Sequence, residues 1–149
     1  MTISLFRGEY SFLSNFYSCD LEFNGILYHS SENAYQAQKA SWDSEIEIDN
    51  KKINTRRYIS TLSASESKKF ARTIKLDSNF ESDKVLIMRD VVYSKFKQNP
   101  YLAKKLLDTK NELLVEGNWW HDTFWGVCNG VGENYLGRIL MEVRTILGG

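Results

Sequence analysis

The sequence of 149 residues has few of several residue types, and each shortage excludes a class of protein. Two cysteines are too few for a disulfide framework, and with only two histidines we expect no metal site. One proline and nine glycines exclude collagen-like and proline-rich chains. No run approaches the roughly 18 apolar residues of a membrane helix, and the first residues turn polar too early for a signal peptide. We therefore expect a soluble, cytoplasmic protein without a cofactor.

The residues that are present are typical of one globular domain. Hydrophobic residues make up 42% of the chain and charged residues 26%, which favours a folded over a disordered chain. At this length, folding buries roughly 68–70% of the surface of the unfolded chain. We expect residues 1–149 to form a single domain that is a monomer or a weak homodimer.

Charge is balanced overall but uneven along the chain. Residues 51–110 contain fifteen Lys or Arg and six Asp or Glu, and the rest of the chain carries a matching deficit of nine. This basic segment fits solvated helix faces or, alternatively, a surface for nucleic acid or polyphosphate. Outside it the cations are few, and a lone cation among carboxylates usually has a specific partner: these are Arg7, Lys39, Arg138 and Arg144.

The local pattern predicts a mainly α domain (α+β) with a small antiparallel sheet near the N-terminus. Strands are expected at residues 3–10 and 20–29, the latter folded into a hairpin at Asn24-Gly25, because a type I′ turn requires positive φ at both central residues. Residues 43–60 combine many charges with little periodicity, and we expect a loop there. Helices are expected at 32–42, after Ser63 (with Glu66 at capping-box spacing), from Asp83, from Asn99-Pro100 and from Asn134, with a buried strand at 113–115.

One predicted helix carries a lysine on a polar face. Glu32, Gln36 and Lys39 lie on the same side of a helix, because seven residues make almost two turns. The pattern fits a solvated face with a weak charge pair, or a lysine held beside acids and amides in a cleft. In the second case, desolvation lowers the pKa of Lys39 and frees it as a nucleophile.

A second candidate cluster combines acids with aromatic residues. Glu116 follows directly on the predicted buried strand, where burial raises the pKa of a carboxyl group. Asp122 lies in a segment with Trp119, Trp120 and Trp125. Aromatic walls with a few polar groups are typical of a pocket for a base or sugar. The alternative is a tryptophan-rich corner of the core in which Asp122 caps a turn.

Three further residues suggest a phosphate site. Arg7 precedes Gly8, where the backbone can approach a ligand closely. Asn134 and Arg138 are four residues apart at the start of the last predicted helix, whose free N–H groups and dipole favour an anion. We expect Arg7, Asn134 and Arg138 to hold a phosphate; the alternative for Arg138 is an ordinary ion pair.

Eight stretches of the chain, in this order, form a combination that is more specific than any one of them. They are Phe6–Gly8, Phe12–Phe16, Ser31–Ala40, Met88 with Lys95–Phe96, Leu106–Thr109, Leu114–Glu116, Asp122 with Trp125–Gly126, and Gly132–Met141. With these stretches the chain resembles the NADAR (YbiA-like) family of N-glycosidases over nearly its whole length, apart from residues 43–60. It departs from the family pattern at Asn33 (commonly His), Phe80 (usually Trp) and Lys110 (usually Gly).

The resemblance implies a mainly α fold and cleavage of the bond between ribose C1′ and an exocyclic amine. It implies two substrate classes, which are ribosylamino-pyrimidine phosphate intermediates of riboflavin synthesis and ADP-ribose attached to guanine in nucleic acid. It places Asn33 on the base-contacting side of the pocket. It also adds five substrate-binding candidates: Ser14, Asn15, Phe16, Tyr35 and Gly126.

Together, the two clusters predict one catalytic cleft. We expect four side chains to converge there beside Trp125: Glu32, Lys39, Glu116 and Asp122. Either Asp122 or Glu116 acts as the acid, and Lys39 attacks C1′ to form a Schiff base. In a second version Lys39 acts only through its charge, and a carboxylate activates water. A different class of protein, a non-catalytic module that binds ADP-ribose or nucleic acid, explains the basic segment and the aromatic residues equally well.

Overall fold

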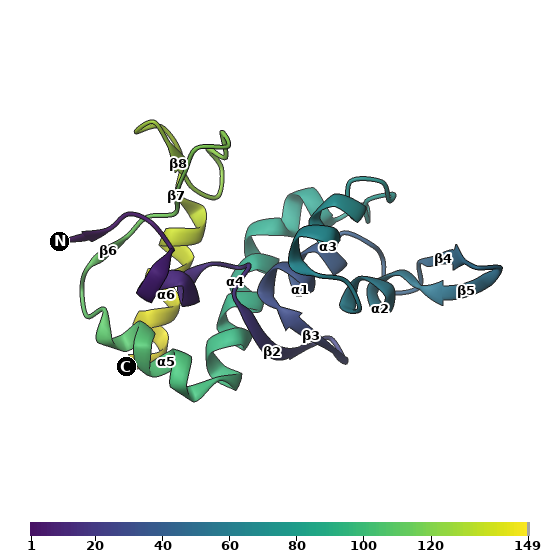
Figure 1. Cartoon of the computed structure of the whole chain (residues 1–149), viewed down its shortest axis with the longest axis horizontal. Coiled ribbons are helices and arrows are strands. Elements are labelled where there is room, and N and C mark those ends of the chain that lie inside the picture. Colours follow the sequence, from purple (N-terminus) through teal and green to yellow (C-terminus); the bar gives the residue numbers. More distant parts are fainter. Residues whose placement is uncertain (149) are drawn as a thin grey trace.

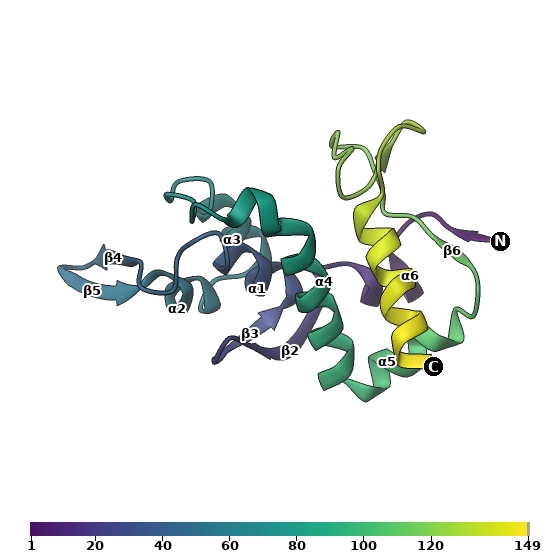
Figure 2. The ribbon, with the colours of Figure 1, turned by 180° about the vertical axis from the view of Figure 1, so that it is seen from behind.

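The computed structural model describes residues 1–148, with a long central helix between two groups of elements (Figure 1). Seen from behind, left and right are exchanged, and the same two groups still flank this helix (Figure 2). The expected mainly α fold is confirmed. The central helix is α4 (Phe80–Gln98); α5 (Pro100–Asp108) and α6 (Tyr135–Gly148) lie on one side, and α1 (Ser31–Ala37), α2 (Thr55–Ser60) and α3 (Ala64–Phe70) lie on the other.

Two helix starts follow the signals in the sequence. The Ser63 hydroxyl accepts a hydrogen bond from the Glu66 N–H, and the Glu66 carboxylate accepts one from the Ser63 N–H, so the predicted capping box is present. Pro100 occupies the first turn of α5, where the N–H that proline lacks has no partner within the helix. In contrast, α1 ends at Ala37, earlier than the predicted residue 42.

The strands of the described residues form separate two-stranded pairs rather than one sheet. β2 (Ser18–Phe23) and β3 (Ile26–Ser30) make the predicted hairpin, with positive φ at both Asn24 and Gly25. Two short pairs are parallel: β1 (Thr2–Ile3) with β6 (Leu113–Leu114), and β7 (Gly117–Asn118) with β8 (Val127–Cys128). The strand expected at residues 3–10 is thus confined to its start, because η1 (Gly8–Leu13), a 3-10 helix, takes up the rest.

The loop expected at residues 43–60 is wrong. β4 (Glu45–Ile48) and β5 (Lys51–Asn54) form an antiparallel hairpin there, and α2 follows it. The turn at Asp49-Asn50 has positive φ at both residues, as a type I′ turn requires. The hairpin projects from one end of the molecule (Figure 1). Glu45-Ile46-Glu47-Ile48 does alternate charged and apolar residues as a strand does, but Lys51-Lys52-Ile53-Asn54 contains one apolar residue and carries no such signal.

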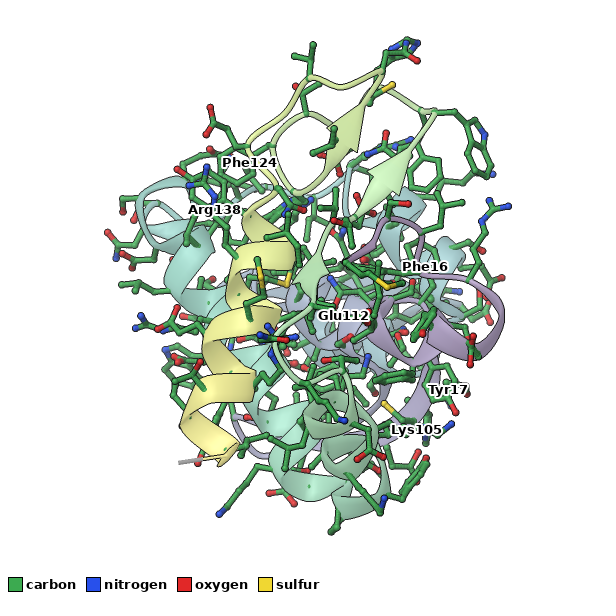
Figure 3. All side chains as sticks on the ribbon, turned by 90° about the vertical axis from the view of Figure 1, so that its left-hand side faces the viewer. Phe16, Tyr17, Lys105, Glu112, Phe124 and Arg138 are labelled. Atoms are coloured by element: carbon green, nitrogen blue, oxygen red, sulfur yellow. The ribbon has the colours of Figure 1, made fainter. Side chains whose placement is uncertain are left out.

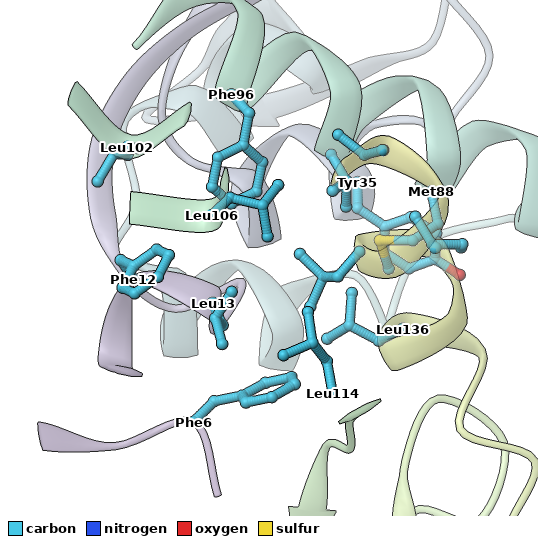
Figure 4. Close-up of a cluster of buried hydrophobic side chains, with 14 of the residues drawn as sticks. Phe6, Phe12, Leu13, Tyr35, Met88, Phe96, Leu102, Leu106, Leu114 and Leu136 are labelled. Carbon is cyan, nitrogen blue, oxygen red and sulfur yellow. The ribbon is translucent and has the colours of Figure 1, made fainter. Parts of the chain in front are cut away.

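The main core lies where η1, α4, α5 and α6 meet (Figure 4). Phe12 and Phe96 pack edge to face, with ring centroids 6.5 Å apart. Tyr35 of α1 and Met88 of α4 lie at the opposite end of the same cluster, beside Leu136 of α6. The core therefore joins α1 to α4 and α6.

One lysine is buried in this core. Lys95 in α4 is 1% exposed, and its Nζ donates hydrogen bonds to the carbonyl oxygens of Phe12 (2.7 Å) and Ser14 (3.0 Å). These bonds hold the end of η1 against α4. Burial lowers the pKa of Lys95 to about 8, because the charged form loses its hydration.

The buried lysine makes the free energy of unfolding depend on alkaline pH. A lysine in the unfolded chain titrates near about 10.4, and Lys95 in the folded chain titrates near about 8. Between these values the unfolded chain binds more protons, so stability rises with pH. In urea unfolding, the unmodified chain should gain on the order of 3 kcal/mol over Lys95→Met across this window.

The exposed Lys97 supplies the control. Lys97→Met should follow the pH profile of the unmodified chain. Parallel profiles for the unmodified chain and Lys95→Met would show that Lys95 keeps an ordinary pKa in the folded protein.

Candidate active site

The acids and the lysine of the two predicted clusters line one cavity of about 760 Å³. One wall comes from α1, α3 and the start of α4. The other comes from the N-terminal segment and the loops around β7 and β8, which Figure 1 shows on the far side of α4 from α3. The predicted convergence beside Trp125 is therefore present. Eleven predicted site residues line this cavity: Arg7, Ser14, Asn15, Phe16, Glu32, Tyr35, Gln36, Lys39, Glu116, Asp122 and Trp125.

Helix α1 presents polar side chains to the cavity although the whole helix is buried. The Ser30 hydroxyl caps the helix by accepting a hydrogen bond from the Asn33 N–H (3.0 Å). Gln36 Nε2 donates a 2.6 Å hydrogen bond to Glu32 Oε2. Burial raises the pKa of Glu32, and the bond from Gln36 opposes this shift.

Lys39 enters the cavity just after α1. The Lys39 N–H donates to the Gln36 carbonyl (3.1 Å), and the Lys39 carbonyl accepts a hydrogen bond from the Asp77 N–H (2.6 Å). Its Nζ lies 6.0 Å from the ring centroid of Tyr35 and 5.9 Å from that of Phe80. Burial lowers the pKa of Lys39, and the charge of Glu32 opposes this shift. The surroundings therefore favour the neutral amine, which is the nucleophilic form.

The two acids of the second cluster are joined through Asn118. Asn118 Nδ2 donates to Glu116 Oε2 (3.2 Å) and to the Asp122 carbonyl (2.8 Å). Asp122 Oδ1 accepts hydrogen bonds from the N–H groups of Phe124 (3.2 Å) and Trp125 (2.9 Å). Burial, and then the negative charge of Asp122, raise the pKa of Glu116 to about 7. Glu116 can therefore carry a proton near neutral pH.

Two predicted binding residues position Glu116 instead of lining the cavity. Asn134 Oδ1 accepts a hydrogen bond from the Glu116 N–H (2.9 Å), and its Nδ2 donates to the Leu114 carbonyl (2.9 Å). At Gly126, a Cβ atom would overlap the carboxylate and the carbonyl of Glu116. Asn134 thus fixes the backbone at Glu116, and Gly126 leaves space for its side chain.

The predicted phosphate site is not assembled. Arg138 forms an ion pair with Glu133 (3.3 Å) and lies near Phe124, apart from Phe16 (Figure 3). Among residues 1–148, neither Arg138 nor Gly8 belongs to the cavity wall. Of the three residues expected to hold phosphate, Arg7 alone lines the cavity, with its guanidinium carbon 4.0 Å from the ring centroid of Trp119.

Asn33, where the chain departs from the family pattern, lies behind the cavity wall. The expectation that Asn33 lies on the base-contacting side is therefore wrong. Asn33 is 1% exposed, and its Nδ2 donates to the carbonyl oxygens of Ile59 (3.0 Å) and Leu62 (2.9 Å). Asn33 therefore ties α1 to the end of α2 and to Leu62, two residues beyond it.

Several residues of the cavity wall were not predicted from the sequence. The most informative are Lys68 and Arg72, which come from the basic segment. Their spacing of four residues places them on one helix face, but the same spacing occurs on solvated helices. Other residues missed are Leu76, Glu81 and Lys84.

The fold and cavity define a class of protein, a small helical domain in which a partly desolvated lysine and carboxylates of a distant segment line the same cavity. The chain belongs to the NADAR family, since the model described as NADAR domain matches residues 5–148. This confirms the resemblance. No helix of the described residues is long and apolar enough to cross a membrane.

Named relatives agree with this assignment. The chain is 34% identical over 140 residues to N-glycosidase YbiA of Shigella boydii serotype 4 (strain Sb227), covering 93% of this chain and 82% of the relative. It is 36% identical over 141 residues to a riboflavin biosynthesis protein of Vibrio vulnificus (strain YJ016), covering 93% of this chain but 36% of that protein. The NMR structure of Escherichia coli YbiA matches with a TM-score of 0.79 and 31% identity, covering 99% of this chain and 84% of that one.

Replacing Asn134 should lower the free energy of unfolding much more than replacing Arg138. Asn134→Ala leaves the Leu114 carbonyl and the Glu116 N–H without partners and should lower the free energy of unfolding by about 1–3 kcal/mol. Arg138→Ala removes a half-exposed ion pair and should change it by less than about 0.5 kcal/mol. Urea unfolding measures both, and equal losses would contradict the structural role of Asn134.

Proposed function

We propose that this chain is an N-glycosidase that hydrolyses the bond between ribose C1′ and an exocyclic amine of a nucleobase or pyrimidine precursor. The observation that carries the proposal is the pairing, in one cavity, of an amine whose pKa is lowered and a carboxyl whose pKa is raised. Relatives named N-glycosidase support it. The substrate classes are ADP-ribosylated guanine in nucleic acid and ribosylamino-pyrimidine phosphates, the latter in line with the relative named for riboflavin biosynthesis.

In the proposed mechanism, Glu116 and Lys39 act in succession. Protonated Glu116 gives its proton to the ring oxygen as the C1′–O bond opens, and neutral Lys39 attacks C1′. The nitrogen of Lys39 then gives up a proton to the nitrogen of the base, the C1′–N bond breaks, and the base departs as a free amine. The sugar stays on Lys39 as a protonated Schiff base, so one difficult step becomes two easier ones. Water hydrolyses the Schiff base, which regenerates the neutral lysine and returns a proton to Glu116.

The other cavity residues support this chemistry. Asp122, held by two backbone N–H groups, keeps the proton on Glu116 and stabilises positive charge at C1′. Glu32 faces Lys39 across the buried end of α1 and exchanges protons with it. Aromatic and polar side chains position the sugar and the base: Arg7, Ser14, Asn15, Phe16, Tyr35, Gln36 and Trp125.

Borohydride trapping tests the role of Lys39. With a ribosylamine substrate, reduction should leave a stable sugar adduct, and peptide mass spectrometry should map it to Lys39. Lys69, an exposed neighbour on α3, provides the control. The adduct should persist in Lys69→Met and disappear in Lys39→Met. If Lys39→Met still cleaves the substrate without an adduct, the alternative with direct attack by water is correct.

The pH dependence tests the role of Glu116. As the proton donor it acts when protonated, so kcat/KM should fall as pH rises through about 7. Glu116→Gln should remove this alkaline limb and lower kcat by about 10²–10⁴-fold. Glu45→Gln, on the exposed β4–β5 hairpin, should keep both rate and profile. A rate that rises through pH 7 would instead make Glu116 a general base.

The second candidate function is a non-catalytic module that binds ADP-ribose or nucleic acid. Its supporting observation is the rim of the cavity, where Trp119 and Trp120 are about half exposed beside Arg7. Incubation with both substrate classes, followed by mass spectrometry, separates the candidates. The proposed enzyme releases free amine and loses turnover in folded Lys39→Met, whereas a binding module leaves both substrates intact.

A further inference from the structure

The cations of the cavity wall differ in whether the protein itself neutralises them. Lys84 forms an ion pair with Glu81, with 3.0 Å between Nζ and Oε2. Lys68 and Arg72 also line the cavity. Among the described residues, neither has a carboxylate within 4.0 Å or a side-chain hydrogen bond. These two charges are therefore available to a ligand.

The two residues come from one wall. Lys68 belongs to α3, Arg72 lies in the turn just after that helix, and both side chains line the cavity. Lys68 Nζ lies 5.8 Å from the ring centroid of Phe16, which is about half exposed at the mouth of the cavity. Its charge also reaches the acids inside, because it lowers the pKa of both Glu32 and Glu116. A group bound by Lys68 is thus close to the proposed reaction centre.

We infer that Lys68 and Arg72 form an anion subsite that binds a phosphate group of the substrate at the α3 wall. A guanidinium offers paired donors to two phosphate oxygens, and an ammonium adds a mobile point charge. Two cations match the charge of a phosphate monoester. The inference rests on the proposed function, since it assigns the phosphate of a ribosyl substrate. The phosphate site predicted from the sequence was at the start of α6, where Arg138 is paired with Glu133. The inferred subsite lies instead on the opposite wall of the cavity.

Binding of ribose 5-phosphate and of ribose tests the subsite without any turnover. The ratio of the two dissociation constants isolates the phosphate, because whatever the sugar and Lys39 contribute is common to both ligands. Lys68→Ala and Arg72→Ala should each weaken ribose 5-phosphate by about tenfold or more, as for a lost hydrogen bond to a charged group. Ribose should bind as before. Lys69→Ala, which removes an exposed charge of the same helix, should change neither.

Arg7→Ala decides between the two walls. If Arg7→Ala abolishes the preference for ribose 5-phosphate while Lys68→Ala and Arg72→Ala keep it, the phosphate lies on the Arg7 wall and the inference is wrong. Equal losses for ribose and ribose 5-phosphate in the α3 variants would also overturn it. Failure of the N-glycosidase proposal shows itself separately, as absence of free amine in the cleavage assay.

Discussion

The site depends on the complete burial of α1, a short helix with a polar face. Burying polar side chains is costly unless they have partners, and the surrounding elements and α1 itself supply most of them, although Gln36 Oε1 has no partner among the described residues. Asn33 binds carbonyl groups near the end of α2, Ser31 bonds to Asn15, and Gln36 bonds to Glu32. These contacts fix the direction of the helix. As a result, Lys39 enters the cavity at the first position after α1 that is not fully buried.

Burial acts in opposite directions on the two proposed catalytic groups. The same loss of hydration that lowers the pKa of Lys39 raises the pKa of Glu116, because the charged form is disfavoured in each case. Both shifts increase the share of the form that the reaction requires, the neutral amine for nucleophilic attack and the protonated acid for proton donation. Asp122 strengthens the shift at Glu116. Loss of hydration in one cavity therefore prepares both groups without a separate device for each.

The sequence predicted those features that neighbouring residues determine. The hairpin at Asn24-Gly25 and the capping box at Ser63 depend on local backbone geometry, and both are present. The convergence of Lys39 with Glu116 was also predicted, although only from the kinds of residue that each segment contains. The β4–β5 hairpin was missed although Glu45-Ile46-Glu47-Ile48 alternates, because the charged β5 contains only one apolar residue. Lys68 and Arg72 were missed because only the tertiary fold determines which of fifteen cations in the basic segment face the cavity.

Asn134 shows why a binding motif and a positioning motif are hard to separate in sequence. Its place before α6 suggests an anion site, since the first N–H groups of a helix are free. In the structure its side chain instead bonds to the backbone at Leu114 and Glu116, on a strand end far away in sequence. Gly126 serves the same carboxylate by leaving space for it. The segments that contain Glu116, Gly126 and Asn134 thus meet at the Glu116 side chain and backbone. A change at Asn134 or Gly126 therefore acts on the proposed proton donor without touching substrate, and its effect on turnover resembles that of a lost binding residue.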